Sequence, residues 1–342
     1  MKRHAVVRIL GELALATTLA ASQFAVANCA DRPDASAGAI GASGGLEAVI
    51  VGVITDASKL CINGLSIQAD AQTAVSMDGK VAALGALAIG QVAVIAASVV
   101  GGTLKAARVM VFHEVIGPVT DVDIAGSELS VMGRRVMLRA SARSLPGAAA
   151  LESLKLGDVL RVSGLRDARG EIDGTRIDLA PASEASVANG RLMWEAERAP
   201  VLAGVRLQFS DAVAASPDLN EKDVRITGRW TGRALVVEDV VIDPLGAILD
   251  RTGRVSLQGY LANDGSGISV AGLRVRISGA TRFDGGDRGS LRSDSEVSAI
   301  GAIRSGRQVY VERISIAPPR PASSRGILLP FNASPPGPAM AR

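Results

Sequence analysis

Gly117-Pro118-Val119 and Met132-Gly133-Arg134-Arg135-Val136 form a pair of short motifs that decides the fold, because the pair occurs four times. The other first motifs are Gly52-Val53-Ile54, Gly190-Arg191-Leu192 and Gly259-Tyr260-Leu261. The other second motifs are Asn63-Gly64-Leu65-Ser66-Ile67, Ala203-Gly204-Val205-Arg206-Leu207 and Ala271-Gly272-Leu273-Arg274-Val275. The glycines of the first motif are 65, 73 and 69 residues apart, and those of the second are 69, 71 and 68 apart. Two motifs that keep one period indicate four tandem copies of one unit.

Within each unit the apolar residues alternate with polar ones, as in Leu273-Arg274-Val275-Arg276-Ile277. This period of two predicts half-buried antiparallel strands. Asn63-Gly64 and Asn263-Asp264-Gly265 predict hairpin turns, because these residues tolerate positive φ. Five or six short strands per unit predict an all-β chain of about four tandem small OB-like antiparallel β-barrels.

A third motif aligns Leu154 to Val162 of the second unit with Leu87 to Ile95 of the first. This alignment decides whether an apolar segment of the first unit spans a membrane. Residues 81–100 are almost wholly apolar and long enough to be a transmembrane candidate. The second copy of this segment carries Lys155, Asp158 and Arg161, so the first copy is predicted to be a turn leading into a strand. In the last two copies we expect Lys222 and Ser295 to replace the turn glycine.

The N-terminus predicts export. A basic start is followed by an apolar stretch that ends in Ala25-Val26-Ala27, a small-x-small cleavage signal. Asn28 disfavours a lipoprotein anchored through Cys29, so we expect a periplasmic or secreted protein with no transmembrane segment after cleavage. The predicted chain begins with a signal peptide (1–27) and a flexible leader (28–47). Four repeats follow (48–113, 114–182, 186–244 and 254–317), of which the last two are divergent. A disordered proline-rich tail (318–342) ends the chain.

Two cysteines remain after cleavage, Cys29 and Cys61. An even pair in an exported protein favours a disulfide. Such a bond would tie the leader to the first folded unit. Two unpaired thiols are the alternative.

The motifs resemble those of the bacterial domain-of-unknown-function family 5666. The best match is in the second unit and is carried by Gly117-Pro118-Val119, Leu129 to Gly133, Leu156-Gly157-Asp158-Val159, Val162-Ser163-Gly164 and Thr175-Arg176-Ile177. The resemblance implies an envelope protein with repeated small β-barrels. It brings no catalytic residues.

The sequence gives little support for catalysis, a metal or a cofactor. His113 is the single histidine after cleavage and is interpreted as an ordinary surface residue; a hydrolase using it as base is the weakest hypothesis. Asp284-Gly285-Gly286-Asp287 lacks the further oxygen ligands of a calcium loop and is interpreted as a polar turn. We therefore expect no enzyme, no cofactor and no metal site.

Charge and aromatic residues suggest where binding would occur. The chain has a net charge of +3, of which residues 1–27 hold +2, leaving +1 for the remainder. The segment from Arg251 to Arg325 contains twelve arginines and six acidic residues, which gives it a local net charge of +6. A solvated face is one reading, and a polyanion site through Arg274 and Arg276 is the other. Candidate ligand-binding residues are Trp230, Arg229, Arg233, Arg274 and Arg276.

The function that fits these features is a non-catalytic binding or scaffold role in the cell envelope. The partner is an unidentified protein or polysaccharide. Nucleic acid is disfavoured, because a near-neutral mature chain has few aromatic residues for base stacking.

Overall fold

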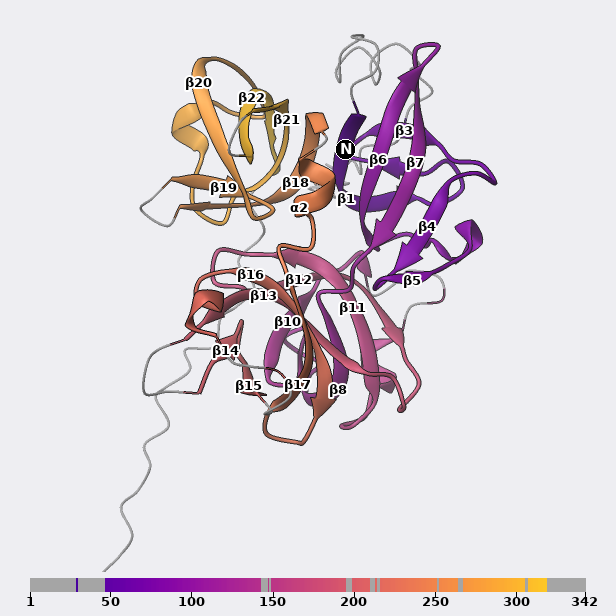
Figure 1. Ribbon diagram of the computed structural model, residues 1–342, viewed down its shortest axis with the longest axis vertical. Coiled ribbons are helices and arrows are strands. Elements are labelled where there is room, and N and C mark those ends of the chain that lie inside the picture. Colours follow the sequence, from indigo (N-terminus) through magenta and orange to yellow (C-terminus); the bar gives the residue numbers. More distant parts are fainter. Residues whose placement is uncertain are drawn as a thin grey trace, which may run out of the picture.

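The computed structural model describes Cys29 and residues 47–318, except 143–146, 148, 195–198, 210–212, 214–215, 251, 264–266 and 305–306. In this part the chain is all-β and forms four five-stranded barrels (Figure 1). The predicted signal peptide and proline-rich tail lie outside the described residues.

Barrel 1 closes through one cycle of strand pairs. Its elements are β1 (Glu47–Asp56), β2 (Cys61–Ile62), β3 (Leu65–Gln68), β4 (Ala74–Met77), β5 (Lys80–Val81), the 3-10 helix η1 (Leu84–Ala86), β6 (Val92–Val100) and β7 (Thr103–Val111). β1, β2 and β3 form an antiparallel meander, and β3 pairs in parallel with β7. β7 pairs with β6, and β6 returns to β1, which closes the barrel.

The other three barrels repeat this cycle. Barrel 2 comprises β8 (Val115–Asp123), β9 (Glu128–Val131), β10 (Arg134–Leu138), η3 (Leu151–Ser153), β11 (Val159–Arg166) and β12 (Ile172–Leu179). Barrel 3 comprises β13 (Ser186–Met193), β14 (Val201–Leu202), β15 (Val205–Phe209), η4 (Pro217–Leu219), β16 (Asp223–Trp230) and β17 (Leu235–Ile242). After the short helix α2 (Gly246–Leu249), barrel 4 comprises β18 (Thr252–Asn263), β19 (Ile268–Val270), β20 (Leu273–Asp284), η5 (Arg288–Ser290), β21 (Glu296–Arg304) and β22 (Gln308–Ile316).

When the five strands of each closed cycle are numbered in chain order, with β4 and β5 of barrel 1 left out, the order in every barrel is first, second, third, fifth, fourth and back to first. Within each cycle only the pair formed by the third and fifth strands is parallel. Outside the cycle of barrel 1, β4 also pairs in parallel with β7. This is the order of an OB-type barrel. The predicted fold class of tandem OB-like barrels is confirmed.

The two repeating motifs meet in space. The second motif begins with a two-residue turn in which both residues have positive φ, as a type I′ hairpin requires. These turns are Asn63-Gly64, Met132-Gly133, Ala203-Gly204 and Ala271-Gly272. Each turn folds back over the glycine of the first motif: a Cβ on Gly259 would lie 2.9 Å from the Ala271 nitrogen. The glycine is therefore needed for close approach, which explains the shared period. Of the other predicted hairpin turn, Asp264 and Gly265 lie outside the described residues.

The turn before the fourth strand differs by one position from the prediction. Gly90 and Gly157 have φ values of 90° and 91°, and the residues with positive φ in the later copies are Glu221 and Asp294. Their amides donate to the first strand in the same way, for example Gly157 to Val119 and Asp294 to Leu261. Lys222 and Ser295 follow these residues, so the prediction that they replace the glycine is wrong. The third and fourth units have no glycine at this turn, so the sequence alone does not show which residue aligns with Gly90 and Gly157.

The apolar run of residues 81–100 is divided between a loop and a strand. It passes from β5 through η1 into β6, whose residues Ala93 to Ala97 are buried. Ala93, Ile95 and Ala97 face the core of barrel 1, whereas Val94 packs with the core of barrel 4. Within the described residues no helix is long and apolar enough to cross a membrane.

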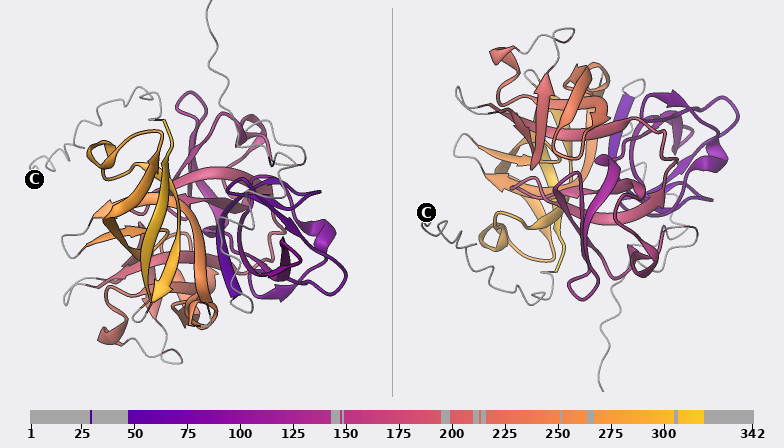
Figure 2. Two further views of the ribbon diagram at one scale, coloured as in Figure 1. Left: turned by 90° about the horizontal axis from the view of Figure 1, so that it is seen from above. Right: turned by 90° about the horizontal axis from the view of Figure 1, so that it is seen from below.

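The barrels are joined through the first half of their first strands. One edge of this half pairs with the fourth strand of the same barrel. The other edge has no partner within the barrel and can pair with a strand of another barrel. β1 pairs in parallel with β18 of barrel 4, from Ala48 opposite Arg254 to Val51 opposite Leu257. β8 pairs antiparallel with β13 of barrel 3. Figure 2 shows barrel 4 beside barrel 1 from above.

The apolar cores follow this pairing. Even-numbered residues of β1, such as Ala48 and Ile50, face the core of barrel 1, whereas Val49 and Val51 pack with the core of barrel 4. Barrels 2 and 3 share one continuous core. The four barrels therefore form one packed block.

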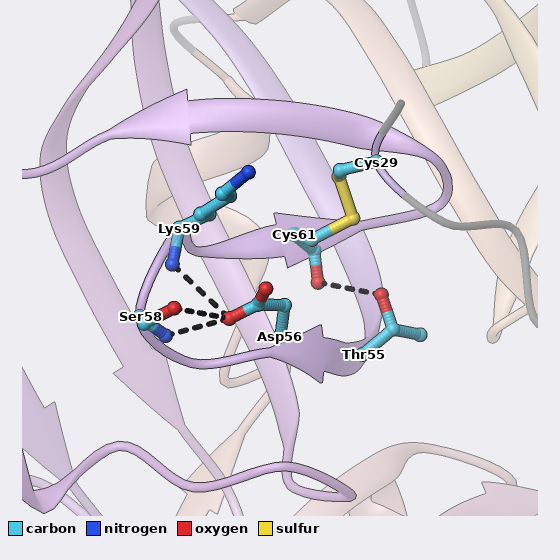
Figure 3. Close-up of a disulfide and its surroundings, with 6 residues drawn as sticks. All are labelled: Cys29, Thr55, Asp56, Ser58, Lys59 and Cys61. Atoms are coloured by element: carbon cyan, nitrogen blue, oxygen red, sulfur yellow. Dashed lines mark hydrogen bonds between the residues drawn. A yellow bond between two sulfur atoms is a disulfide. The ribbon is translucent and has the colours of Figure 1, made fainter. Parts of the chain in front are cut away.

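The predicted disulfide is confirmed. Cys29 is bonded to Cys61, with a distance of 5.9 Å between the two Cα atoms and a sequence separation of 32 (Figure 3). The bond is attached to β2 next to the turn in which the Asp56 carboxylate accepts from the Ser58 and Lys59 amides. A closed loop of this length stabilises the fold by about 3–4 kcal/mol in the chain-entropy model.

Gly259→Ala tests the packing of the first-motif glycine on the hairpin turn. The added Cβ would meet backbone, so we expect a loss of about 1–3 kcal/mol in the free energy of unfolding. Gly279→Ala, in β20 of the same barrel, is the matched control, because nothing lies within 4 Å of its Cβ position. Thermal denaturation compares the two. Equal melting temperatures for the two variants would contradict the steric explanation.

Candidate functional site

An open groove with a volume of about 530 Å³ lies on barrel 4 and is the strongest candidate site. It runs over strands β18, β20, β21 and β22, which Figure 1 shows in orange and yellow. Its lining residues are Arg254, Ser278, Ala280, Arg282, Ile300, Ala302, Arg304, Tyr310, Val311, Glu312 and Arg313.

Tyr310 is the aromatic centre of this groove. Strand register places it opposite Ala302 on β21 and opposite Arg276 on β20. The guanidinium carbon of Arg304 lies 4.5 Å from the centre of its ring, and that of Arg276 lies 5.7 Å away. Both distances are within the range of cation–π attraction. Two arginines are thus held against one ring.

A bulge in β20 brings a second pair of arginines to the groove. β20 leaves its register with β22 after Ile277 and resumes it at Arg282, which lies opposite Arg313. Thr281 holds the bulge: its hydroxyl donates to the Val311 carbonyl at 2.8 Å and accepts from the Ser278 amide at 3.0 Å. Barrel 1 has the same device in Thr73, which donates to the Ala106 carbonyl.

The groove is electropositive. Its lining holds four arginines against one glutamate, a net of +3. Glu312 is bound by Arg254, with N–O distances of 2.5 and 2.8 Å. Arg313 lies 3.9 Å from Asp284, a loose contact between two half-exposed side chains. Exposed contacts of this kind are weak, so Arg282, Arg304 and Arg313 are available to an anion.

The other barrels do not repeat this site. The residues at the position of Tyr310 are Lys105, Asp173 and Val236, and those at the position of Arg276 are Gln68, Met137 and Gln208. In barrel 2 the same face is covered by barrel 4: the Tyr260 hydroxyl donates to Asp173 at 2.7 Å, and Leu165 is buried beside Tyr260. Among the described residues, the pairing of a tyrosine with an arginine at these two positions therefore occurs in barrel 4 alone.

The candidate residues from the sequence fall in two places. Arg274 and Arg276 lie on the exposed face of β20, with Val275 buried between them, and Arg276 contacts Tyr310. Arg229 and Arg233 are exposed on barrel 3. Trp230 packs partly buried against the shared core of barrels 2 and 3. The structure does not bring these two groups together into one site.

Sequence reasoning missed Arg254, Arg282, Arg304, Arg313 and Tyr310. Tyr310 is absent from the binding residues predicted from the sequence. The signal that could have placed it is alternation: Val309 and Val311 are buried, so Tyr310 lies on the outward face with Glu312. The arginines come together only through cross-strand register and the bulge.

His113 is not a surface residue, which corrects the prediction. Its side chain is 2% exposed, and its Nδ1 lies 2.6 Å from the Asp78 carboxylate. Asp78 also accepts from Arg225 of barrel 3 at 2.7 Å. The backbone carbonyl of His113 accepts from Asn189 of barrel 3. The His113 side chain is therefore part of a junction between barrels 1 and 3.

Asp78 is the charged centre of this junction. Burial alone would raise the pKa of its carboxyl, but the hydrogen bond from His113 and attraction to His113 and Arg225 lower the pKa below the ordinary value. The Nε2 atom of His113 is buried with no hydrogen-bond partner among the described residues. Across the described part of the chain no group of three or more His, Cys, Asp or Glu side chains is arranged to hold a metal ion.

Comparison with known families identifies two of the barrels. Residues 116–178 and residues 253–315 each match the family model described as Domain of unknown function (DUF5666). The matches cover barrels 2 and 4 almost from first strand to last, including the fourth unit that the sequence suggested to be divergent. No curated protein and no solved structure matches the chain.

Asp78→Ala tests the junction. It leaves Arg225 and His113 without their carboxylate, so we expect a loss of roughly 3 kcal/mol at pH 7. A carboxyl whose folded pKa lies below its unfolded value of about 3.9 stabilises the fold above that pH, and the contribution disappears as the pH falls through the folded pKa. The difference between variant and wild type should therefore shrink at and below pH 3.

Urea denaturation followed by fluorescence measures this difference, because Trp194 and Trp230 both lie in or beside barrel 3. Asp239→Asn is the control, since Asp239 is exposed on β17. Equal destabilisation by Asp78→Ala at both pH values would contradict the assignment.

Proposed function

We propose that this chain, whose second and fourth barrels match the DUF5666 family model, is an exported, non-catalytic binding protein. In this proposal the four barrels form a rigid scaffold, and the groove on barrel 4 binds an anionic partner in the cell envelope. The observation that carries the proposal is the clustering of Arg254, Arg282, Arg304 and Arg313 on one open face.

The scaffold role is supported by contacts between barrels that are distant in sequence. Arg139 of barrel 2 binds Glu296 of barrel 4 at 2.9 Å. Thr175 of barrel 2 donates to the Gly90 carbonyl of barrel 1 at 2.6 Å. With the strand pairs between barrels 1 and 4 and between barrels 2 and 3, these contacts oppose relative motion. A rigid block holds the groove in one orientation.

Export is supported by the N-terminal sequence and by the disulfide between Cys29 and Cys61. Disulfides persist in oxidising compartments and are rare in the cytosol. The bond lies just beyond the predicted cleavage site, so it would tie the start of the mature chain to barrel 1.

A non-catalytic role is supported by the position of His113. It is the one histidine outside the N-terminal segment, and it is buried and bound at a barrel junction. The groove itself is lined by arginines, apolar residues and one glutamate that is held by Arg254. Such a lining binds anions through charge-assisted hydrogen bonds.

Retention of the full chain on immobilised heparin tests anion binding. The double variant Arg282→Glu/Arg304→Glu should elute at lower salt. Its plot of log affinity against log salt concentration should be shallower by about one unit per arginine lost. Glu312→Gln removes the one acidic side chain of the groove lining and should shift elution to higher salt.

Arg229→Glu/Arg233→Glu on barrel 3 changes the net charge by the same amount and is the matched control. It should leave retention nearly unchanged. If it abolishes retention while the groove variant does not, the binding site is beside Trp230 and the groove proposal is wrong. Absence of salt-dependent retention for the wild type would overturn anion binding altogether.

A further inference from the structure

The faces of the Tyr310 ring limit what the groove can bind. The guanidinium groups of Arg304 and Arg276 both lie over this ring. Proteins that bind single-stranded nucleic acid stack bases on open aromatic faces. Tyr310 is the one aromatic residue among the residues that line the groove. A nucleobase that stacked on Tyr310 would compete with these guanidinium groups for the ring.

The ring instead positions cations. An arginine held over an aromatic ring can still donate from the N–H groups at the edge of its guanidinium, and these groups match the oxygens of sulfate, phosphate or carboxylate. The ring also restricts the arginine before a ligand arrives, which reduces the entropy lost on binding. Tyr310 is therefore a positioning residue for Arg304 and Arg276.

The arginines also set the length of the ligand. Tyr310 and Arg313 are three residues apart on β22, so their Cα atoms lie about 10 Å apart along the strand. The arginines are therefore anchored at two places along the groove. A ligand that carries several anionic groups along its length matches this arrangement better than a single small anion does.

The floor of the groove is suited to a non-aromatic chain. Ile300 and Ala302 are partly exposed between the two groups of arginines. The carbon-bound hydrogens of a sugar ring can pack on such a surface while its acidic substituents reach the guanidinium groups. The floor offers no second ring for base stacking.

We infer that the groove of barrel 4 binds an acidic polysaccharide, with Tyr310 holding Arg304 and Arg276 in position for its sulfate or carboxylate groups. This inference rests on the proposed anion-binding function and names the class of ligand. It excludes single-stranded nucleic acid as the preferred ligand of this site.

Fluorescence anisotropy with the full chain and three labelled probes of matched length tests this inference. The probes are a heparin oligosaccharide, an oligogalacturonate and oligo(dT), each titrated at several salt concentrations. We expect at least one of the two saccharides to bind at least tenfold tighter than oligo(dT) at the same salt. The heparin and galacturonate arms distinguish sulfate from carboxylate as the recognised group.

Variants at position 310 test the role of the ring. Tyr310→Leu removes the cation–π contacts and should weaken saccharide binding roughly two- to fivefold. Tyr310→Phe keeps the ring and should bind as the wild type does. Arg304→Gln tests the cation directly without changing Tyr310, in case Tyr310→Leu disturbs the barrel, and it should weaken binding at least as much.

The outcomes separate the two proposals. If oligo(dT) binds as tightly as the better saccharide, or if Tyr310→Leu folds and binds like the wild type, the inference is overturned while anion binding stands. If no probe binds and the Arg282→Glu/Arg304→Glu variant behaves like the wild type on heparin, the proposed function itself is wrong.

Discussion

A five-stranded barrel of this order leaves half of one strand edge unpaired. The first half of the first strand has the fourth strand on one side, while the second strand joins it only near its end, as β2 joins β1 at Ile54. An unpaired edge can pair with any other chain and is a risk for aggregation. Here the edges satisfy one another: β1 pairs with β18, and β8 pairs with β13. The arrangement of the four barrels follows from how these edges are covered.

Covering the edges decides which outer faces remain open. The fourth and fifth strands of barrel 2 lie against barrel 4, so Leu165 and Asp173 are buried and contact Tyr260. The fifth strand of barrel 4 has no such neighbour among the described residues, and Tyr310 and Glu312 remain accessible. Two barrels of one family thus present different outer faces. The face of barrel 4 that stays open carries charged residues, which remain in contact with solvent there and so avoid the free-energy cost of burying a charge.

The sequence contained most of the fold because the fold depends on local, repeated requirements. Gly259 and the turn at Ala271-Gly272 must approach closely, and each requirement appears four times with one period. The turn at Glu221 was placed one residue late, because a non-glycine residue with positive φ has no clear signature. His113 was misplaced because its burial depends on Asp78, thirty-five residues earlier, and on Arg225 of another barrel. The groove could be predicted only in part. The sequence shows the arginine enrichment of the fourth unit, but which arginines lie together depends on the register between strands.

The groove depends on the barrels that do not form it. Arg304 and Arg276 bind an anion well only if their side chains are already ordered, because immobilising a long side chain costs about 0.5–1.5 kcal/mol. Tyr310 supplies that order, and Tyr310 is itself fixed by β20 and β21, its neighbours in barrel 4. β21 in turn pairs with β18, whose other edge is held by β1 of barrel 1. A chain of backbone pairing therefore connects the disulfide-bonded first barrel to the binding face of the last.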